Sequence, residues 1–327
     1  MTRALRCHAL VLGLAAALAL SGCGGGQAPS PSAGAGGLEK AVIKVGTLPV
    51  PDAVALYIAD ARGLFAAEGL TVEPVTITGV TAALPQVESG ALDVSQTTYV
   101  STFLAVSKGR KIKLVADMYR AAPGTFTIMV QKNSPIRTVA DLKGKTILVN
   151  TLGNIATLAV TTQLKAAGLA ATDVTFAKKP FPEMGNAITS GQADAGWVTE
   201  PFITASSKAL GFRTIADTMT GPTAGLPIAG WMASEQWARQ NPKTLAAFQR
   251  AISKAQQIAS SDRKAVEAAL PTYTNIDRTT AEAITLGAYP STLEASRLQK
   301  VADLMLEHNY IDAPIDVKSV MVPPDDR

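Results

Sequence analysis

Cysteine and histidine are nearly absent from this chain of 327 residues, which contains only Cys7, Cys23, His8 and His308. If the first 22 residues are removed, a single thiol remains and no internal disulfide can form. One thiol and one imidazole also cannot build a cysteine–histidine zinc site. A serine–histidine–carboxylate triad would have to use His308, near the C-terminus. These absences disfavour enzymes whose chemistry depends on thiol or imidazole groups.

Charged residues are also few, at 17% of the chain, whereas 47% of the residues are hydrophobic. A disordered protein has the opposite balance, so this chain is expected to fold. The formal net charge is +4, and it falls to +2 without Arg3 and Arg6, which lie in the N-terminal segment described next. So small an excess of basic residues makes nucleic acid an unexpected partner. The length allows one large domain or two of ordinary size.

An uncharged run near the N-terminus, Ala9 to Leu20, is too short to cross a membrane as a helix, which needs ~20 residues. Preceded by Arg3 and Arg6, it has the pattern of a signal-peptide core. The next four residues, Leu20-Ser21-Gly22-Cys23, resemble the bacterial lipobox. This resemblance implies that a signal peptide over residues 1–22 is removed and that Cys23 carries lipid, with acyl chains such as palmitate. The alternative is an ordinary signal peptide that happens to contain this cysteine.

Residues 23–37 contain almost nothing that could enter a hydrophobic core, because Gly24 to Gly37 reads GGGQAPSPSAGAGG. This composition predicts a flexible tether with a span of roughly 20 Å. Two acyl chains on Cys23 would hold the protein lastingly on a membrane. We therefore expect a lipid-anchored protein on the extracytoplasmic face of the cell membrane, with its globular part starting near Leu38.

From Leu38 onward, short strand patterns alternate with helical patterns in two successive cycles. The first cycle predicts strands at 41–46, 70–75, 91–95 and 112–116, with helices between them. The second predicts strands at 146–149, 174–177, 193–198 and 212–215. A returning strand is expected at 228–232, followed by an almost wholly helical tail. Such alternation predicts an α/β fold with mainly parallel sheets covered on both faces.

The two cycles have the same order of elements, which predicts two similar lobes. Glycine and proline mark two candidate crossings between them, at Pro123-Gly124-Thr125 and from Gly221 to Pro227, and these suit a hinge. Lobe 1 would then comprise residues 38–124 and 226–327, and lobe 2 residues 125–225. Because ligands bind beyond the carboxyl ends of parallel strands, the expected site is the cleft between the lobes.

Several short segments resemble one family of transport proteins. Gly63 to Glu73 reads GLFAAEGLTVE and follows the family phrase G-x-F-x-x-x-G-L-x-V-E. Ser89 to Val94 (SGALDV), Asp141 to Lys145 (DLKGK) and Ser190 to Ala195 (SGQADA) follow in order. Together they resemble the solute-binding proteins of ABC importers, in particular the nitrate, sulfonate, taurine and thiamine-precursor family. The resemblance spans about residues 40–231 and implies a type II periplasmic-binding fold.

The resemblance also implies that the protein captures a small solute and passes it to a membrane permease. The sequence has no G-x-x-x-x-G-K-[ST] motif, so a partner ATPase would have to supply the energy. We expect a monomer without cofactor or metal. Two alternatives stay open, a lipid-anchored ligand sensor without transport and, less favoured, an enzyme on the same fold.

In lobe 1, the loop after the first predicted strand brings Leu48, Asp52 and Ala53 to a helix N-terminus, with Tyr57 one turn further along. These four residues are candidate ligand contacts. Asp52 could instead act only as a helix N-cap, and Tyr57 could belong to the core.

The polar run from Ser95 to Thr98 follows the third predicted strand and offers hydrogen bonds, so Gln96 and Thr97 are candidate contacts. Tyr119, past the fourth strand, could present its ring to the cleft.

In lobe 2, Gly153 and Asn154 precede a predicted helix whose free N–H groups could hold an oxyanion. The alternative is a plain loop with Asn154 as the helix cap. Trp197, Thr199 and Glu200 follow the 193–198 strand or lie at its end. Trp197 could stack on a flat ligand or pack in the core of the lobe.

The charges of these candidate residues bear on the ligand. None of the candidate loops contains an arginine, the side chain best suited to bind two oxygens of an anion, and Arg120 is the nearest. Asp52 and Glu200 instead favour a cationic or neutral ligand with N–H donors. A pyrimidine- or thiamine-precursor-like solute is therefore favoured, while a sulfonate-, nitrate- or taurine-like solute stays open because backbone N–H groups can also bind an anion.

Overall fold

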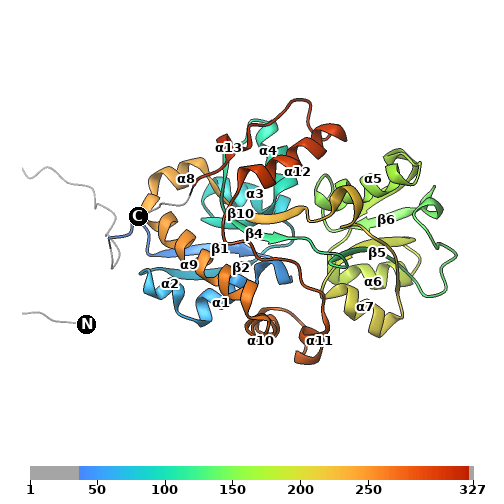
Figure 1. Cartoon of the computed structure of the whole chain (residues 1–327), viewed down its shortest axis with the longest axis horizontal. Helices are drawn as coiled ribbons and strands as arrows, with labels where there is room; N and C mark the ends of the chain where they lie inside the picture. The colour runs from blue at the N-terminus through green and yellow to red at the C-terminus, as the bar shows by residue number, and fades with distance from the viewer. Residues whose placement is uncertain (1–36, 324–327) are drawn as a thin grey trace, which may run out of the picture. The chain divides into compact units, whose positions relative to one another are not determined.

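The computed structural model describes residues 37–323, which belong to one compact unit built around two five-stranded sheets (Figure 1). The first sheet has the strand order β2-β1-β3-β10-β4. Its strands are β1 (Val42–Thr47), β2 (Thr71–Thr76), β3 (Val94–Thr98), β4 (Ile112–Arg120) and β10 (Pro227–Ser234). Strand β10 runs antiparallel to both of its neighbours, and the other four strands share one direction.

The second sheet repeats this plan with the order β7-β6-β8-β5-β9. Its strands are β5 (Phe126–Val130), β6 (Thr146–Val149), β7 (Thr175–Lys178), β8 (Ala195–Thr199) and β9 (Arg213–Asp217). Here β5 is the strand that runs against the others. We call the first sheet with its helices lobe 1 and the second sheet with its helices lobe 2.

Helices separate most successive strands of each lobe and form most of the C-terminal part of the described chain. In lobe 2 they are α5 (Ile155–Ala166), α6 (Phe181–Thr189) and α7 (Phe202–Leu210). Those of lobe 1 are α1 (Val54–Ala61), α2 (Leu64–Ala67), α3 (Val80–Ser89), α4 (Tyr99–Ser107), α8 (Glu235–Gln240), α9 (Pro242–Ser261), α10 (Arg263–Tyr273), α11 (Arg278–Ala283), α12 (Ala295–Glu307) and α13 (Val317–Val320). Short 3-10 helices add single turns at Pro51–Ala53, Ala140–Leu142, Ala171–Asp173 and Gly221–Thr223.

The chain passes between the two sheets twice, between β4 and β5 at residues 121–125 and between β9 and β10 at residues 218–226. The two antiparallel strands, β5 and β10, are each the first strand after a crossing. The predicted fold class, an α/β protein with two mainly parallel sheets joined by two crossings, is therefore confirmed.

The repeated segment Ser-Gly-x-x-Asp has the same structural role in each lobe. In lobe 1, the carboxylate of Asp93 accepts a hydrogen bond from Lys44 N at 2.8 Å, and Asp93 N donates to Lys44 O at 3.0 Å. In lobe 2, Asp194 forms the same pair of bonds with Thr146, at 2.9 and 3.0 Å. Each aspartate thereby ties the start of β3 or β8 to the parallel strand beside it.

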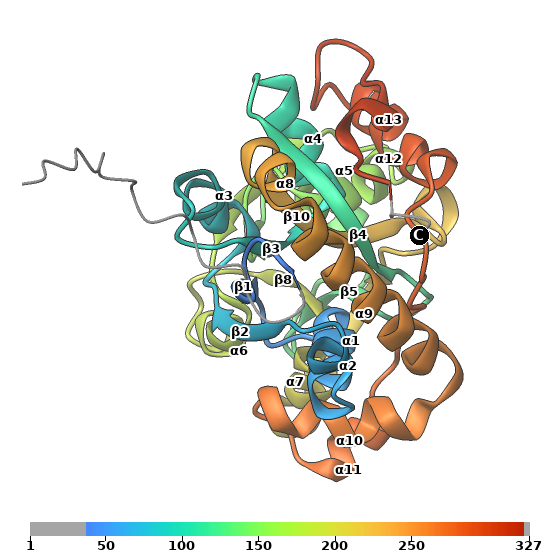
Figure 2. The same cartoon turned by 90° about the vertical axis from the view of Figure 1, so that its left-hand side faces the viewer.

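Helix α9 runs alongside β4, the edge strand of the first sheet (Figure 2). Gln249 and Gln256 are seven residues apart and therefore lie on one face of this helix. The Nε2 group of Gln249 donates to Val115 O at 2.7 Å, and that of Gln256 donates to Met118 O at 2.8 Å. These bonds satisfy carbonyl groups of an edge strand that has no strand on that side.

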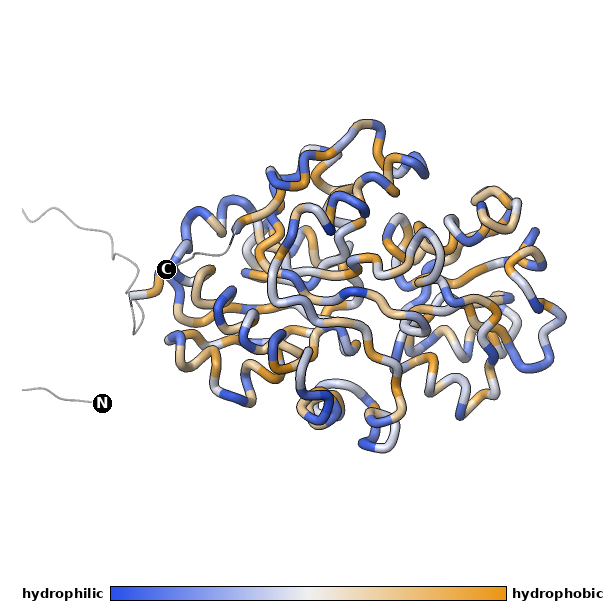
Figure 3. Tube along the Cα trace, in the orientation of Figure 1, coloured by the Kyte–Doolittle hydropathy of each residue, from blue (hydrophilic) through white to orange (hydrophobic). Residues whose placement is uncertain are grey.

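Hydrophobic residues recur along the strands of both lobes, and hydrophilic residues gather on the outer helices (Figure 3). The largest core cluster contains residues of both lobes, among them Ile43 of β1 and Val149 of β6. Trp197 of β8 and Trp231 of β10 are the two largest fully buried side chains. Apolar packing therefore continues from one lobe into the other.

Two sequence-based expectations differ from the structure. Strand β5 was not predicted, because its five residues, FTIMV, are almost all apolar and buried and show no alternation. Strand β3 lies at 94–98 rather than 91–95, so Ser95 to Thr98 form the strand instead of following it. The hydroxyl groups of this polar strand have local partners, such as the 3.0 Å bond between Thr97 and Thr102.

The predicted signal peptide, Cys23 and the tether up to residue 36 lie outside the described residues. Within residues 37–323, no helix has both the length and the apolar character that crossing a membrane requires.

We predict that Gly287→Ala destabilises the protein by ~1–3 kcal/mol, the usual cost of overpacking. A Cβ atom at Gly287 would lie 2.6 Å from Cζ of Tyr119 and would also collide with the carbonyl oxygen of Arg120. Neither the backbone at Arg120 nor the buried ring of Tyr119 can move aside without a loss of stability. Urea unfolding measures the change.

The matched control is Gly185→Ala, whose Cβ would lie 2.8 Å from Cδ1 of Leu210. That atom ends a side chain that is 39% exposed and can rotate away. Gly185 lies within α6, where alanine is favoured over glycine by ~1 kcal/mol. An equal loss of stability in both variants would contradict the prediction.

Candidate functional site

A cavity of about 30 Å³ lies between the lobes, at the carboxyl ends of their parallel strands. Each lobe contributes half of its lining. The lobe 1 residues are Leu48, Val50, Asp52, Val80, Gln96, Thr98 and Ile228, and the lobe 2 residues are Phe126, Asn150, Asn154, Ile155, Phe181, Trp197 and Thr199. This volume suits roughly two water molecules, so the lobes must move apart before an organic solute can enter.

Strands β1 and β3 position the floor of the cavity in lobe 1. Oε1 of Gln96, on β3, accepts a hydrogen bond from Leu48 N at 2.9 Å and a longer one from Thr47 Oγ1 at 3.4 Å. This pairing fixes the loop that leaves β1. The Nε2 amide of Gln96 forms no side-chain hydrogen bond within the described residues, which leaves its N–H groups for a ligand.

Asp52 is the most unusual residue of the cavity. It lies in the 3-10 turn Pro51–Ala53 and is 5% exposed, yet its Oδ1 has no hydrogen-bond partner among residues 37–323. Burial without a neighbouring cation disfavours the charged form and raises the pKa of the Asp52 carboxyl to about 7. Asp52 does not act as an N-cap for α1, whose cap position is occupied by Ala53.

Three buried tyrosines, Tyr119, Tyr273 and Tyr289, surround Asp52, and burial raises the pKa of each. Their hydroxyl groups are engaged elsewhere. Tyr273 donates to Val50 O at 3.1 Å, Tyr289 donates to Pro51 O at 3.3 Å, and Tyr119 accepts from a backbone N–H. These bonds hold the loop that contains Asp52 but leave its Oδ1 without a donor.

In lobe 2, Asn150 follows β6 and Asn154 caps α5. Oδ1 of Asn154 accepts from Ala156 N at 2.9 Å, and Asn154 N donates to Thr157 Oγ1 at 3.1 Å. Nδ2 of Asn154 and Oδ1 of Asn150 are buried and have no partner in the described part of the chain. A donor and an acceptor are therefore free on this wall.

Three aromatic rings form the rest of the lobe 2 wall. Trp197 stacks on Phe126 with ring centroids 4.9 Å apart, and Phe181 lies 6.3 Å from Trp197. The indole Nε1 of Trp197 donates to Thr218 Oγ1 at 2.9 Å, so the polar edge of the ring points into lobe 2. The apolar part of the ring can then border the cavity.

A wider groove of about 350 Å³ lies beside the cavity and also spans both lobes. Pro49, Asn275 and Ile276 line it from lobe 1, and helices α6 and α7 line it from lobe 2. The groove and the cavity share one lining residue, Phe181. Phe181 therefore borders both spaces.

The structure brings half of the predicted site residues to the cavity, and these are Leu48, Asp52, Gln96, Asn154, Trp197 and Thr199. The other six, Ala53, Tyr57, Thr97, Tyr119, Gly153 and Glu200, do not line it.

Tyr57 stacks on Tyr273 with centroids 3.8 Å apart, and Tyr119 packs edge-on against Tyr289. Both predicted tyrosines thus belong to the aromatic packing behind the cavity. Ala53 is fully buried at the start of α1, and Gly153 adopts the left-handed conformation (φ +64°) before α5.

Glu200 is engaged in other bonds. Its carboxylate accepts hydrogen bonds from N and Oγ1 of Thr204, at 3.0 and 2.9 Å, and from Thr285 N at 3.3 Å. The first two bonds cap α7 of lobe 2, and the third reaches the C-terminal segment of lobe 1. Burial raises the pKa of Glu200. The residue links the lobes beside the cavity.

Sequence reasoning missed several apolar lining residues. Phe126 was missed because β5 was not predicted, and Ile228 lies at the start of the returning strand. Val80 and Phe181 begin the helices α3 and α6. A usable signal existed, because both helices follow the second parallel strand of their lobe, β2 or β7, and so point their N-termini to the same sheet edge.

Neither a metal site nor a histidine is associated with this cavity. Within residues 37–323, no group of three or more His, Cys, Asp and Glu side chains could hold a metal ion. His308 follows α12, with its Nε2 3.2 Å from Thr162 Oγ1 of α5. Asp52 is the one ionisable side chain among the described residues that line the cavity.

Known proteins share this fold over most of the chain. An aliphatic sulfonates-binding protein of Escherichia coli (strain K12) is 23% identical over 235 residues, which are 70% of this chain and 72% of that protein. The alkanesulfonate-binding protein SsuA from Xanthomonas axonopodis pv. citri, solved with bound MOPS, has a TM-score of 0.73 at 20% identity, covering 86% of this chain and 98% of that one.

An enzyme is similar in fold as well. The desulfurization enzyme DSZB has a TM-score of 0.63 at 16% identity, over 87% of this chain and 97% of that one. The family model described as NMT1/THI5 like matches residues 50–283, which is most of the described chain. The chain therefore belongs to the NMT1/THI5-like family.

Proposed function

We propose that this protein is the extracytoplasmic solute-binding component of an ABC importer. The observation that carries the proposal is the small cavity whose lining comes half from each lobe, with two crossings joining the lobes. A solute that contacts both walls binds the closed form better than the open form. That difference in affinity is the means by which a ligand can shift the equilibrium towards closure.

A binding role fits the chemistry of the cavity better than catalysis does. General acid–base catalysis needs a positioned proton donor and acceptor, and nucleophilic catalysis needs an activated nucleophile. Asp52 has no ionisable partner among the described lining residues. The remaining polar groups are amides and hydroxyls, which orient a solute without reacting with it.

The proposed ligand contacts are Leu48, Asp52, Gln96, Asn154, Trp197 and Thr199, together with the unpartnered Asn150. Thr199 donates to Thr125 O at 2.9 Å, within the first crossing, so ligand contact and hinge position are linked. Glu200 would favour the closed form through its bond to Thr285 N. Ala53, Tyr57, Thr97, Tyr119 and Gly153 would act by holding these groups in place.

The proposed setting follows from the N-terminal sequence. A diacylglycerol on Cys23 and a tether over residues 23–37 would keep a monomeric binder on the extracytoplasmic face of the membrane. Tethering raises the effective concentration of the binder near its permease. The permease and an ATPase would complete the importer, and no cofactor is required for capture.

We predict that the transported solute stabilises the protein by ~2.7 kcal/mol at a free concentration 100 times its Kd, because it binds the folded form alone. Thermal unfolding should be followed with nitrate, taurine, alkanesulfonates, pyrimidine precursors, riboflavin and polyamines. A cell that lacks the protein should also lose uptake of the compound that stabilises it. If the compound binds but uptake persists unchanged, the importer role is wrong.

We predict that Asn150→Ala weakens this binding at least tenfold and leaves the stability of the free protein nearly unchanged. The reason is that Oδ1 of Asn150 has no partner in the described chain to lose. Calorimetric titration measures the affinity. The matched control is Asn133→Ala, at an exposed position of lobe 2 away from the cavity, which should bind as the wild type does. Equal affinities in both variants would remove Asn150 from the site.

We predict that Cys23→Ser abolishes labelling of the protein by radioactive palmitate and releases it from the membrane fraction. The sulfur of Cys23 is the atom that would carry the diacylglyceryl group, with its acyl chains, through a thioether bond, and serine has no sulfur to form it. Cys7→Ser is the control, because this cysteine lies in the segment expected to be removed and should leave labelling intact. Membrane retention of the Cys23→Ser protein would contradict the anchor.

A further inference from the structure

We propose that the captured solute is a small organic cation with N–H donors, and that its positive end binds Asp52. This inference rests on the proposed function of solute capture and specifies the charge of the solute. Such a cation has the opposite charge to the sulfonates in the names of the similar proteins. The groups that line the cavity favour it.

The cavity contains buried acceptors that need hydrogen-bond donors. Asp52 is 5% exposed, and its Oδ1 has no hydrogen-bond donor in residues 37–323. Oδ1 of Asn150, on the opposite wall, is a second buried acceptor without a partner. Buried acceptors are normally satisfied, so two that face one cavity indicate a ligand that brings N–H or O–H groups.

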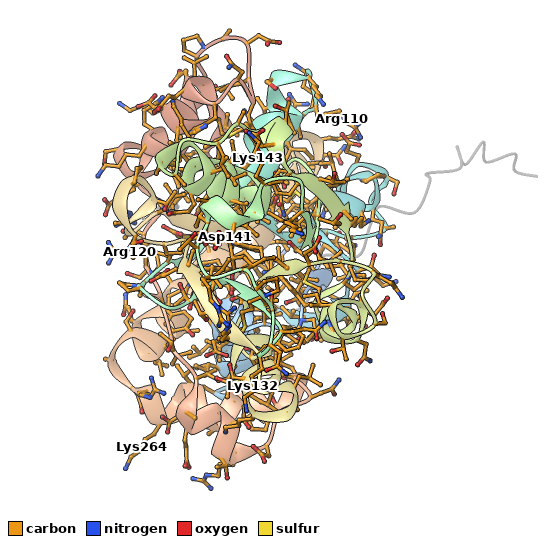
Figure 4. The ribbon with its side chains drawn as sticks, turned by 90° about the vertical axis from the view of Figure 1, so that its right-hand side faces the viewer. Arg110, Arg120, Lys132, Asp141, Lys143 and Lys264 are labelled. Carbon is orange, nitrogen blue, oxygen red and sulfur yellow. The ribbon has the colours of Figure 1, made fainter. Side chains whose placement is uncertain are left out.

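The described lining of the cavity also has no positive group that could bind an anion. No lysine, arginine or histidine lines the cavity in the described part of the chain. The cations labelled in Figure 4, Arg110, Arg120, Lys132, Lys143 and Lys264, all lie outside its lining. An anion here would face the Asp52 carboxylate with no countercharge.

Helix N-termini are another means of holding an anion, beside the side-chain amides of Gln96 and Asn154. At α5, the cap residue Asn154 already accepts from Ala156 N, and Asn154 N is bound to Thr157 Oγ1. At α4, Thr98 Oγ1 accepts from Ser101 N at 3.1 Å. The side chains of the protein thus occupy N–H groups at these two helices. The N-termini of α3 and α6, at Val80 and Phe181, have no side-chain cap, but an anion held there would share the cavity with the carboxyl group of Asp52.

The aromatic wall of lobe 2 indicates what the rest of the solute is like. Trp197, Phe126 and Phe181 form an aromatic wall across the cavity from Asp52. Such rings favour a flat or apolar body and also attract positive charge on their faces. Nδ2 of Asn154 is an unpartnered buried donor, and Nε2 of Gln96 also forms no side-chain hydrogen bond in the described chain, so the cavity suits a solute that carries acceptor atoms beside its positive end.

Matched probes of opposite charge test the proposal. Benzamidinium and methylguanidinium are compact cations with N–H donors, and benzenesulfonate and methanesulfonate carry the same bodies with a negative charge. Calorimetric titration of the full protein should detect binding of at least one cation and of neither sulfonate at millimolar concentration. Tighter binding of a sulfonate than of its cationic counterpart overturns the proposal, and so does the failure of both cations to bind.

The pH dependence gives the second readout. Burial raises the pKa of Asp52 to about 7, so a cation should bind at least tenfold more tightly at about pH 9 than at about pH 5, where the carboxyl is protonated. The neighbouring groups Tyr119, Tyr273 and Tyr289 stay neutral over this range because their pKa values are also raised. Tighter binding of the cation at the lower pH overturns the proposal.

The variant Asp52→Asn keeps the shape of the side chain and removes its charge. It should lose cation affinity at least tenfold and lose the pH dependence, whereas Asp60→Asn, at an exposed position of α1, should change neither. An Asp52→Asn protein that binds as the wild type does overturns the proposal.

Thermal unfolding shows whether Asp52→Asn still folds. The folded wild type binds the Asp52 proton more tightly than the unfolded chain does, because the pKa is raised from 3.8 to about 7. The wild type therefore loses stability as the pH rises from about 4 to about 7, and the variant lacks this loss. The melting temperature of the variant should rise relative to the wild type over that window. The opposite trend would show that the carboxylate has a cationic partner and would overturn the proposal.

The outcomes separate the two proposals. A sulfonate that binds and closes the lobes overturns the charge of the solute and leaves solute capture standing. If no compound of either charge stabilises the protein, both proposals are wrong.

Discussion

The two crossings between the sheets are the constraint on which the rest of this structure depends. Each crossing delivers the chain into the middle of a sheet as an antiparallel strand, β5 in lobe 2 and β10 in lobe 1. Phe126, the first residue of β5, and Ile228, the second residue of β10, therefore lie at the sheet edge where the parallel strands end, and both line the cavity. Each sheet is held internally by its own ladder and by Asp93 or Asp194. Relative motion is then concentrated in residues 121–125 and 218–226.

The same backbone plan occurs twice, but the two lobes contribute different chemistry to the cavity. Gln96 and Trp197 each lie three residues after the aspartate of the Ser-Gly-x-x-Asp segment, and Thr98 and Thr199 lie five residues after it. Lobe 1 thus presents an amide where lobe 2 presents an indole ring. Asp52 follows the first parallel strand of lobe 1, β1, much as Asn154 follows the first parallel strand of lobe 2, β6. A solute in the cavity meets a polar wall on one side and an aromatic wall on the other.

The sequence predicted the fold well because the alternation of strands and helices depends on local periodicity and on glycine and proline. It predicted the cavity residues less well, because lining depends on side-chain direction, which periodicity does not specify. Tyr57 lies five residues after Asp52, and Tyr119 lies towards the end of β4, so both were predicted to line the cleft. The rings of both nevertheless pack against other tyrosines. Glu200 follows a strand that ends at the cavity, but it caps α7 instead. Strand β3 starts three residues later than predicted, because residues 91–93 form a bend that ends at Asp93.

Asp52 also links the chemistry of the cavity to the closing of the lobes. With its pKa raised from 3.8 to about 7, keeping the carboxylate charged and buried at neutral pH costs about 4 kcal/mol, as an order of magnitude. Lobe 2 supplies the opposite wall of the cavity, so much of that cost arises when the lobes close. Closing the lobes without a hydrogen-bond donor for Asp52 therefore costs free energy. A solute that supplies this donor removes the cost. A buried carboxylate without a partner would in this way make the closed form depend on the solute, which is the property that a permease needs in order to distinguish loaded from unloaded protein.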